Sequence, residues 1–81
     1  MDKTRRMIAT VNSLVKKLDP KVIVDRTFYD DVSGRLFVSL VKGQRGHEFN
    51  LHNRDFDNDD LKELSQSIQA GIDRIQHQPI G

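Results

Sequence analysis

The chain has 81 residues, a net charge of +1, and 36% hydrophobic and 31% charged residues, which together predict one small globular domain. It contains no cysteine, which excludes disulfides, thiolate zinc sites and cysteine nucleophiles. No apolar run approaches the ~18 residues that a membrane span requires.

The positive and negative charges are divided unequally along the chain. Residues 1–45 hold ten Lys/Arg and five Asp/Glu, giving +5, whereas residues 46–81 hold three and seven, giving −4. Such an imbalance can simply solvate the surface, or it can orient a partner or a second copy of the chain. Both interpretations stay open. Residues 1–19 are basic but lack the apolar stretch of a signal peptide, so we expect a mature, cytoplasmic protein.

The first predicted element is an amphipathic helix that ends at Leu18. Its apolar residues follow the 3.6-residue period: Met7, Ile8, Val11, Leu14, Val15 and Leu18. Asp2 or Thr4 can cap its start. The Asp19-Pro20 pair predicts the end of the helix, because proline disfavours helical geometry in the residue before it.

Three strands are predicted next, at residues 21–30, 35–42 and 47–52. Residues 32–34 suit a three-residue hairpin loop with Gly34 in the left-handed region, which pairs Tyr29 with Phe37. Residues 43–46 suit a four-residue loop, which pairs Phe37 with His52. The strands therefore form an antiparallel meander.

This register predicts one apolar face and one mixed face for the sheet. The apolar face carries Val24, Phe28, Leu36, Val38, Leu40, Phe49 and Leu51, with Arg26 opposite Leu40 at the sheet edge. The mixed face carries Ile23, Tyr29, Phe37, Val41 and His52. We expect the helices to cover the apolar face and to leave the mixed face open.

A second helix is predicted after Asp57, which we expect to be its N-cap, with Phe56 and Leu61 as a hydrophobic staple. Its apolar stripe consists of Leu61, Leu64, Ile68, Ile72 and Ile75. Gly71 lies beside that stripe. Glycine destabilises a helix by about 1 kcal/mol relative to alanine, so its presence here indicates that another element packs closely against the helix at this position. Residues 77–81 are predicted to be a flexible tail, so the domain is residues 1–76.

The resulting order is α-β-β-β-α, an α+β fold in which both helices pack on one face of a three-stranded antiparallel sheet. The order resembles that of double-stranded RNA-binding domains in topology, not in residues. Those domains carry a lysine-rich segment at the start of the second helix, where this chain has Asp57-Asn58-Asp59-Asp60. Membership of that family is not inferred.

The sequence does not predict an enzyme, a cofactor or a small-molecule substrate. Asp55, Asp57 and Asp59 alternate as in a calcium loop, but position six is Asp60 and position twelve is Gln66 instead of glycine and glutamate. We therefore expect no metal site.

Two functions are compatible with the sequence, and we favour the first. It is a non-enzymatic interaction or regulatory module that binds itself or another protein through the mixed face, with Ile23, Tyr29, Phe37, Val41 and His52 as contact residues. The alternative is a nucleic-acid-binding module. It would use the basic residues of the first helix and second hairpin: Lys3, Arg5, Arg6, Lys16, Lys17, Lys42 and Arg45.

Overall fold

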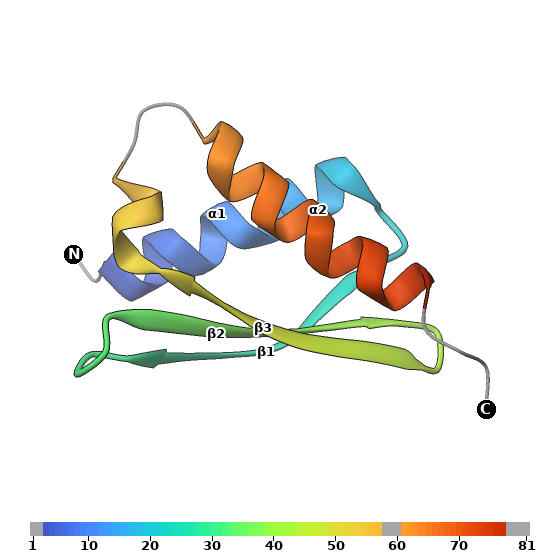
Figure 1. Ribbon diagram of the computed structural model, residues 1–81, viewed down its shortest axis with the longest axis horizontal. Helices are drawn as coiled ribbons and strands as arrows, with labels where there is room; N and C mark the ends of the chain where they lie inside the picture. The colour runs from blue at the N-terminus through green and yellow to red at the C-terminus, as the bar shows by residue number, and fades with distance from the viewer. Residues whose placement is uncertain (1–2, 58–60, 78–81) are drawn as a thin grey trace.

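The computed structural model describes residues 3–57 and 61–77, and it confirms the α+β fold in the order α1-β1-β2-β3-α2. Two helices lie on one side of a three-stranded antiparallel sheet, whose other side carries no helix (Figure 1). Among the described residues, no helix is long and apolar enough to cross a membrane.

Helix α1 spans Lys3–Leu18 and ends where the sequence predicts. Its inner side buries Met7, Val11 and Val15, while Leu18 at the last turn stays partly exposed. Thr4 lies within the helix, and Asp2 lies outside the described residues.

The sheet consists of β1 (Ile23–Asp30), β2 (Arg35–Lys42) and β3 (Arg45–His52), with β2 in the centre. Alternation of side chains along a strand explains the burial of β2, in which Leu36, Val38 and Leu40 are fully buried. These residues face the helices.

The predicted register between β1 and β2 is wrong over most of β1. Phe28, not Tyr29, pairs with Phe37, and a bulge between Val24 and Arg26 restores the predicted facing of Val24. The hairpin loop has four residues, 31–34, because the Asp30 carboxylate accepts hydrogen bonds within the loop and the Gly34 N–H donates to the Asp30 carbonyl. Gly34 is left-handed as predicted, at φ 70°.

A one-residue slip exchanges the two faces of a strand, and here it changes the facing of every side chain from Arg26 to Asp30. Phe28 and Arg26 lie on the face away from the helices, and Tyr29 lies on the helix side, where it packs against the core. The Tyr29 hydroxyl accepts a hydrogen bond of 3.2 Å from Asn53 Nδ2. Arg26 thereby leaves the core-facing position that the sequence analysis assigned to it.

The register between β2 and β3 differs from the prediction by two residues. Phe37 pairs with Asn50 instead of His52, because the loop is only Gly43-Gln44. Gly43 has φ 64°, as the first position of a type II′ hairpin turn requires. A shift of two residues preserves the facing of every side chain, so Phe49 and Leu51 remain on the helix side as predicted.

A short 3-10 helix, η1 (Asn53–Phe56), follows β3, and α2 spans Lys62–Gln76. Asp57 is the C-cap of η1 and not the N-cap of α2, where Leu61 stands without a side-chain hydrogen bond. Asp59 and Asp60 lie outside the described residues, as do residues 78–81 of the predicted tail.

The core lies between the helices and the sheet. Its buried hydrophobic residues, among those the structure describes, are Met7, Val11, Val15, Val22, Leu36, Val38, Leu40, Leu51, Leu64, Ile68, Ile72 and Ile75. The predicted close packing at Gly71 is confirmed, since a Cβ there would lie 2.9 Å from Phe49 Cε1.

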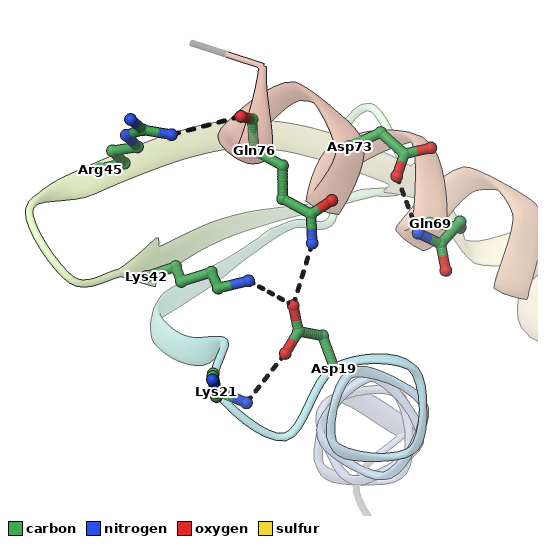
Figure 2. Close-up of polar contacts among 7 residues, drawn as sticks. All are labelled: Asp19, Lys21, Lys42, Arg45, Gln69, Asp73 and Gln76. Atoms are coloured by element: carbon green, nitrogen blue, oxygen red, sulfur yellow. Dashed lines mark hydrogen bonds and ion pairs between the residues drawn. The ribbon is translucent and has the colours of Figure 1, made fainter. Parts of the chain in front are cut away.

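Asp19 ties the end of α1 to the sheet and to α2 (Figure 2). Its Oδ2 accepts from Lys42 Nζ at 2.8 Å and from Gln76 Nε2 at 3.2 Å, and its Oδ1 accepts from the Lys21 N–H at 3.0 Å. The Lys42 hydrogen bond, followed by that from Lys21, lowers the pKa of Asp19 below its ordinary value. Arg45 Nη1 donates to the Gln76 carbonyl at 3.2 Å, which fixes the second hairpin against the last turn of α2.

Candidate functional site

The face of the sheet that points away from both helices is the candidate site, and we call it the open face. It is built from cross-strand rows, because each row takes one residue from each strand. Its rows are Ile23–Val41–Gly46, Arg26–Ser39–Glu48, Phe28–Phe37–Asn50 and Asp30–Arg35–His52.

Apolar side chains occupy the middle and one end of the open face. Phe28 is 66% exposed and lies against Phe37, with ring centroids 6.3 Å apart and a tilt of 33°. Ile23 is 64% exposed, and its row neighbour Val41 is partly exposed. An open depression of about 470 Å³ lies over the two central rows, lined by Arg26, Thr27, Phe28, Phe37, Ser39 and Glu48.

Charged and polar side chains lie beside these apolar residues, and the row Arg26–Ser39–Glu48 separates Ile23 and Val41 from the phenylalanine pair. Arg26 Nε lies 3.5 Å from Asp25 Oδ2 on the outer edge of β1, and Glu48 is exposed on β3 at the opposite edge. Arg35 Nη1 donates to Asn50 Oδ1 at 2.8 Å. An apolar centre with a polar rim is the usual plan of a protein–protein contact surface.

The structure places three of the five predicted contact residues on the open face: Ile23 and Val41 are neighbours in one row, and Phe37 lies two rows away, beyond Ser39. Tyr29 is not among them, since it packs under the helices. His52 reaches the end of the face, but its ring serves η1: Nδ1 accepts from the Arg54 N–H at 3.1 Å. The Asp55 carboxylate accepts from the His52 N–H at 3.2 Å, which completes a capping box.

Phe28 is the large apolar residue of the open face that sequence reasoning missed. Phe28 and Tyr29 are adjacent, so a single step of register decides which ring faces outward. The assignment of Arg26 to a core-facing position was the available signal of a wrong register, because charged residues are rarely placed in cores. The Asp30 side chain was a second signal, since aspartate before a turn favours a loop closed by its own hydrogen bonds.

Three of the seven basic residues that the alternative function would use make contacts within the chain. Lys3 Nζ pairs with Asp57 Oδ1 at 3.2 Å, and Lys42 and Arg45 make the contacts to Asp19 and Gln76 described above. The remaining four are exposed on α1: Arg5, Arg6, Lys16 and Lys17. Arg5 and Lys16 are eleven residues apart, as are Arg6 and Lys17. This spacing places the two residues of each pair on nearly the same side of the helix, ~16 Å apart along its axis.

The residues that suggested a partial calcium loop have other roles. Asp55 caps η1 and Asp57 pairs with Lys3, while Asp59 lies outside the described residues. Within residues 3–57 and 61–77, no three His, Asp or Glu side chains lie close enough to hold a metal ion. His47 stacks on Phe49 on the helix side of β3, with ring centroids 6.1 Å apart, away from His52 on the open face.

Comparisons with protein-family models, with curated proteins and with solved structures found no match.

Proposed function

We propose that the chain is a small non-enzymatic interaction module whose open face binds a protein. The observation that carries the proposal is the exposure of Phe28 beside Phe37 at the centre of a sheet face that neither helix covers. Single exposed apolar residues are ordinary, but a cluster with a charged rim is typical of binding surfaces.

The hairpin geometry supports this proposal. The bulge near Asp25 and the four-residue loop turn Phe28 outward and Tyr29 inward, so a large apolar ring faces solvent. Full burial of such a side chain contributes ~1.5–3 kcal/mol, which a binding partner would recover. Bulges commonly re-aim side chains in this way at sites of function.

A photo-crosslinking experiment tests the proposal in cells that express the chain. A benzoylphenylalanine replaces Phe28, and a matched control carries it at Asn12, which is exposed on α1. We expect the open-face probe to form a crosslink to one protein, identified by mass spectrometry as this chain or another. We expect the control to form none.

A second substitution in the same chain establishes that the open face is responsible. Phe37→Asp places a charge at the centre of the face without touching the core, so folding should be retained by circular dichroism. It should abolish the crosslink from position 28. Equal crosslinking from both probe positions, or crosslinking that survives Phe37→Asp, would contradict the proposal.

Nucleic-acid binding stays the alternative, carried by the exposed Arg5, Arg6, Lys16 and Lys17. Phosphate contacts weaken steeply with salt, so the decisive measurement is retention of single- and double-stranded oligonucleotides at low and high salt. Absence of binding at low salt would remove this alternative.

A further inference from the structure

We propose that the occupant of the open face is a second copy of this chain, related by a two-fold axis that runs along β2. This inference rests on the proposed function, because it names the partner of the same surface. A two-fold axis in this direction places β1 of each copy over β3 of the other and β2 over β2. Each β1 residue then faces a residue of the second copy's β3, namely the one that occupies the same cross-strand row.

Charge complementarity selects this axis. Arg26 and Glu48 stand at the two ends of one row, on β1 and β3, with Ser39 between them. Rotation about β2 brings Arg26 over the partner's Glu48, and the same pair forms again by symmetry. An axis perpendicular to the strands through this row would instead oppose two Arg26 and two Glu48 side chains, which is unfavourable.

The neighbouring rows are compatible in shape. Ile23 projects over the partner's Gly46, which has no side chain to obstruct it. Phe28 lies over the partner's Asn50. The Oδ1 atom of Asn50 already accepts a hydrogen bond from Arg35, so it keeps this hydrogen bond when Phe28 covers it. Phe37 lies near the axis and meets its own copy, an aromatic contact that favours association.

Arg35 lies on β2 at the other end of the face. Because the axis runs along β2, the two Arg35 side chains of a dimer lie near each other. Its hydrogen bond to Asn50 directs the guanidinium toward β3. Because the two-fold axis reverses β1 and β3, the two guanidinium groups point to opposite sides of the dimer.

The size of the face predicts a weak, reversible dimer. Three strands at ~4.8 Å spacing and eight residues at ~3.3 Å each give a face of about 14 by 26 Å, or about 370 Å² in projection. The two faces together total about 740 Å², which is below the roughly 1,000 Å² that stable interfaces exceed and corresponds to a transient contact. We expect a dissociation constant on the order of 10–100 μM.

A charge-reversal series measured by analytical ultracentrifugation, from roughly 10 to 1000 μM chain, tests the inference. Arg26→Glu and Glu48→Arg should each weaken dimerisation about tenfold, since each replaces two attractive contacts by two repulsive ones. The double variant should return to within about threefold of the wild type, because it restores both contacts with reversed sign. High salt should reduce the differences in dissociation constant between the variants, because it screens the charges.

A second readout does not depend on the charges. The chain has no native cysteine, so Ser39→Cys introduces a single thiol near the axis. A bismaleimide reagent that spans the ~10 Å between packed sheets should link two copies through it. Ser13→Cys, on the exposed side of α1, is the matched control and should not be linked efficiently.

A wild type that remains monomeric over the whole concentration range, or a double variant no better than the single ones, would overturn the homodimer. In that case an open-face crosslink to a different protein would leave the proposed function intact. Absence of any open-face crosslink in cells would overturn the proposed function as well, so the two failures are distinguishable.

Discussion

The substitution Gly71→Ala tests the contact between α2 and the sheet. Gly71 is buried, and a Cβ at this position would lie 2.9 Å from Cε1 and 3.0 Å from Cδ1 of the Phe49 ring. Two effects therefore oppose each other. Alanine is favoured over glycine in a helix interior by about 1 kcal/mol, whereas inserting a methyl group into a packed contact typically costs about 1–3 kcal/mol.

The structure indicates that the clash is the larger effect. The Phe49 ring lies against Gly71 on one side and stacks on His47, so it must shift and disturb that stacking to admit a methyl group. We expect Gly71→Ala to lower the free energy of unfolding by about 1 kcal/mol, which lowers the melting temperature by about 4–8 °C in a domain of this size. In a Phe49→Leu background the ring is absent, and Gly71→Ala should become neutral or stabilising by up to about 1 kcal/mol.

Urea denaturation followed by far-UV circular dichroism measures the effect of Gly71→Ala on the free energy of unfolding in the wild-type and Phe49→Leu backgrounds. Ala70→Gly, on the exposed side of α2, is the control that gives the helix-propensity difference in this helix. If Gly71→Ala stabilises the wild type, or changes the free energy of unfolding equally in both backgrounds, then the contact with Phe49 does not explain the glycine.

Three further predictions follow from the polar contacts and the first hairpin. Because the folded pKa of Asp19 is lowered by Lys42, its contribution to stability is present above its ordinary pKa of 3.8 and is lost as pH falls through the folded pKa. Asp19→Asn should therefore destabilise the protein at pH 7, and urea denaturation of both proteins should show the difference closing in acid. Tyr29→Phe removes the hydrogen bond from Asn53 and should cost about 0.5–1.5 kcal/mol by urea denaturation, whereas an exposed Tyr29 would give no change. Gly34→Ala introduces a side chain at φ 70° and 3.2 Å from Asn53 Nδ2, so we expect a cost of about 1–2 kcal/mol in thermal unfolding, and an unchanged melting temperature would contradict it.

The order of elements could be predicted because its signals are local. The 3.6-residue spacing and the Asp19-Pro20 pair identified α1, and the alternation of Leu36, Val38 and Leu40 identified β2 and its buried face. The close packing of Gly71 also followed from its place beside an apolar stripe.

The composition of the open face was predicted only in part. The open-face residues of β2, Phe37 and Val41, follow from the alternation of that strand, which does not depend on either hairpin loop. Whether Phe28 or Tyr29 joins them depends on the loop that Asp30 closes with its own side chain. Loop length can rarely be decided from sequence, because three- and four-residue loops both accept a glycine in the left-handed region.

The bulge in β1 also affects the outer edge of the sheet. β1 has a neighbour on one side only, so its outer backbone groups could in principle accept a strand from another molecule. The irregularity at Asp25 interrupts that outer row, and the Asp25–Arg26 pair places charges along it. An edge interrupted in this way opposes the addition of a further strand alongside β1.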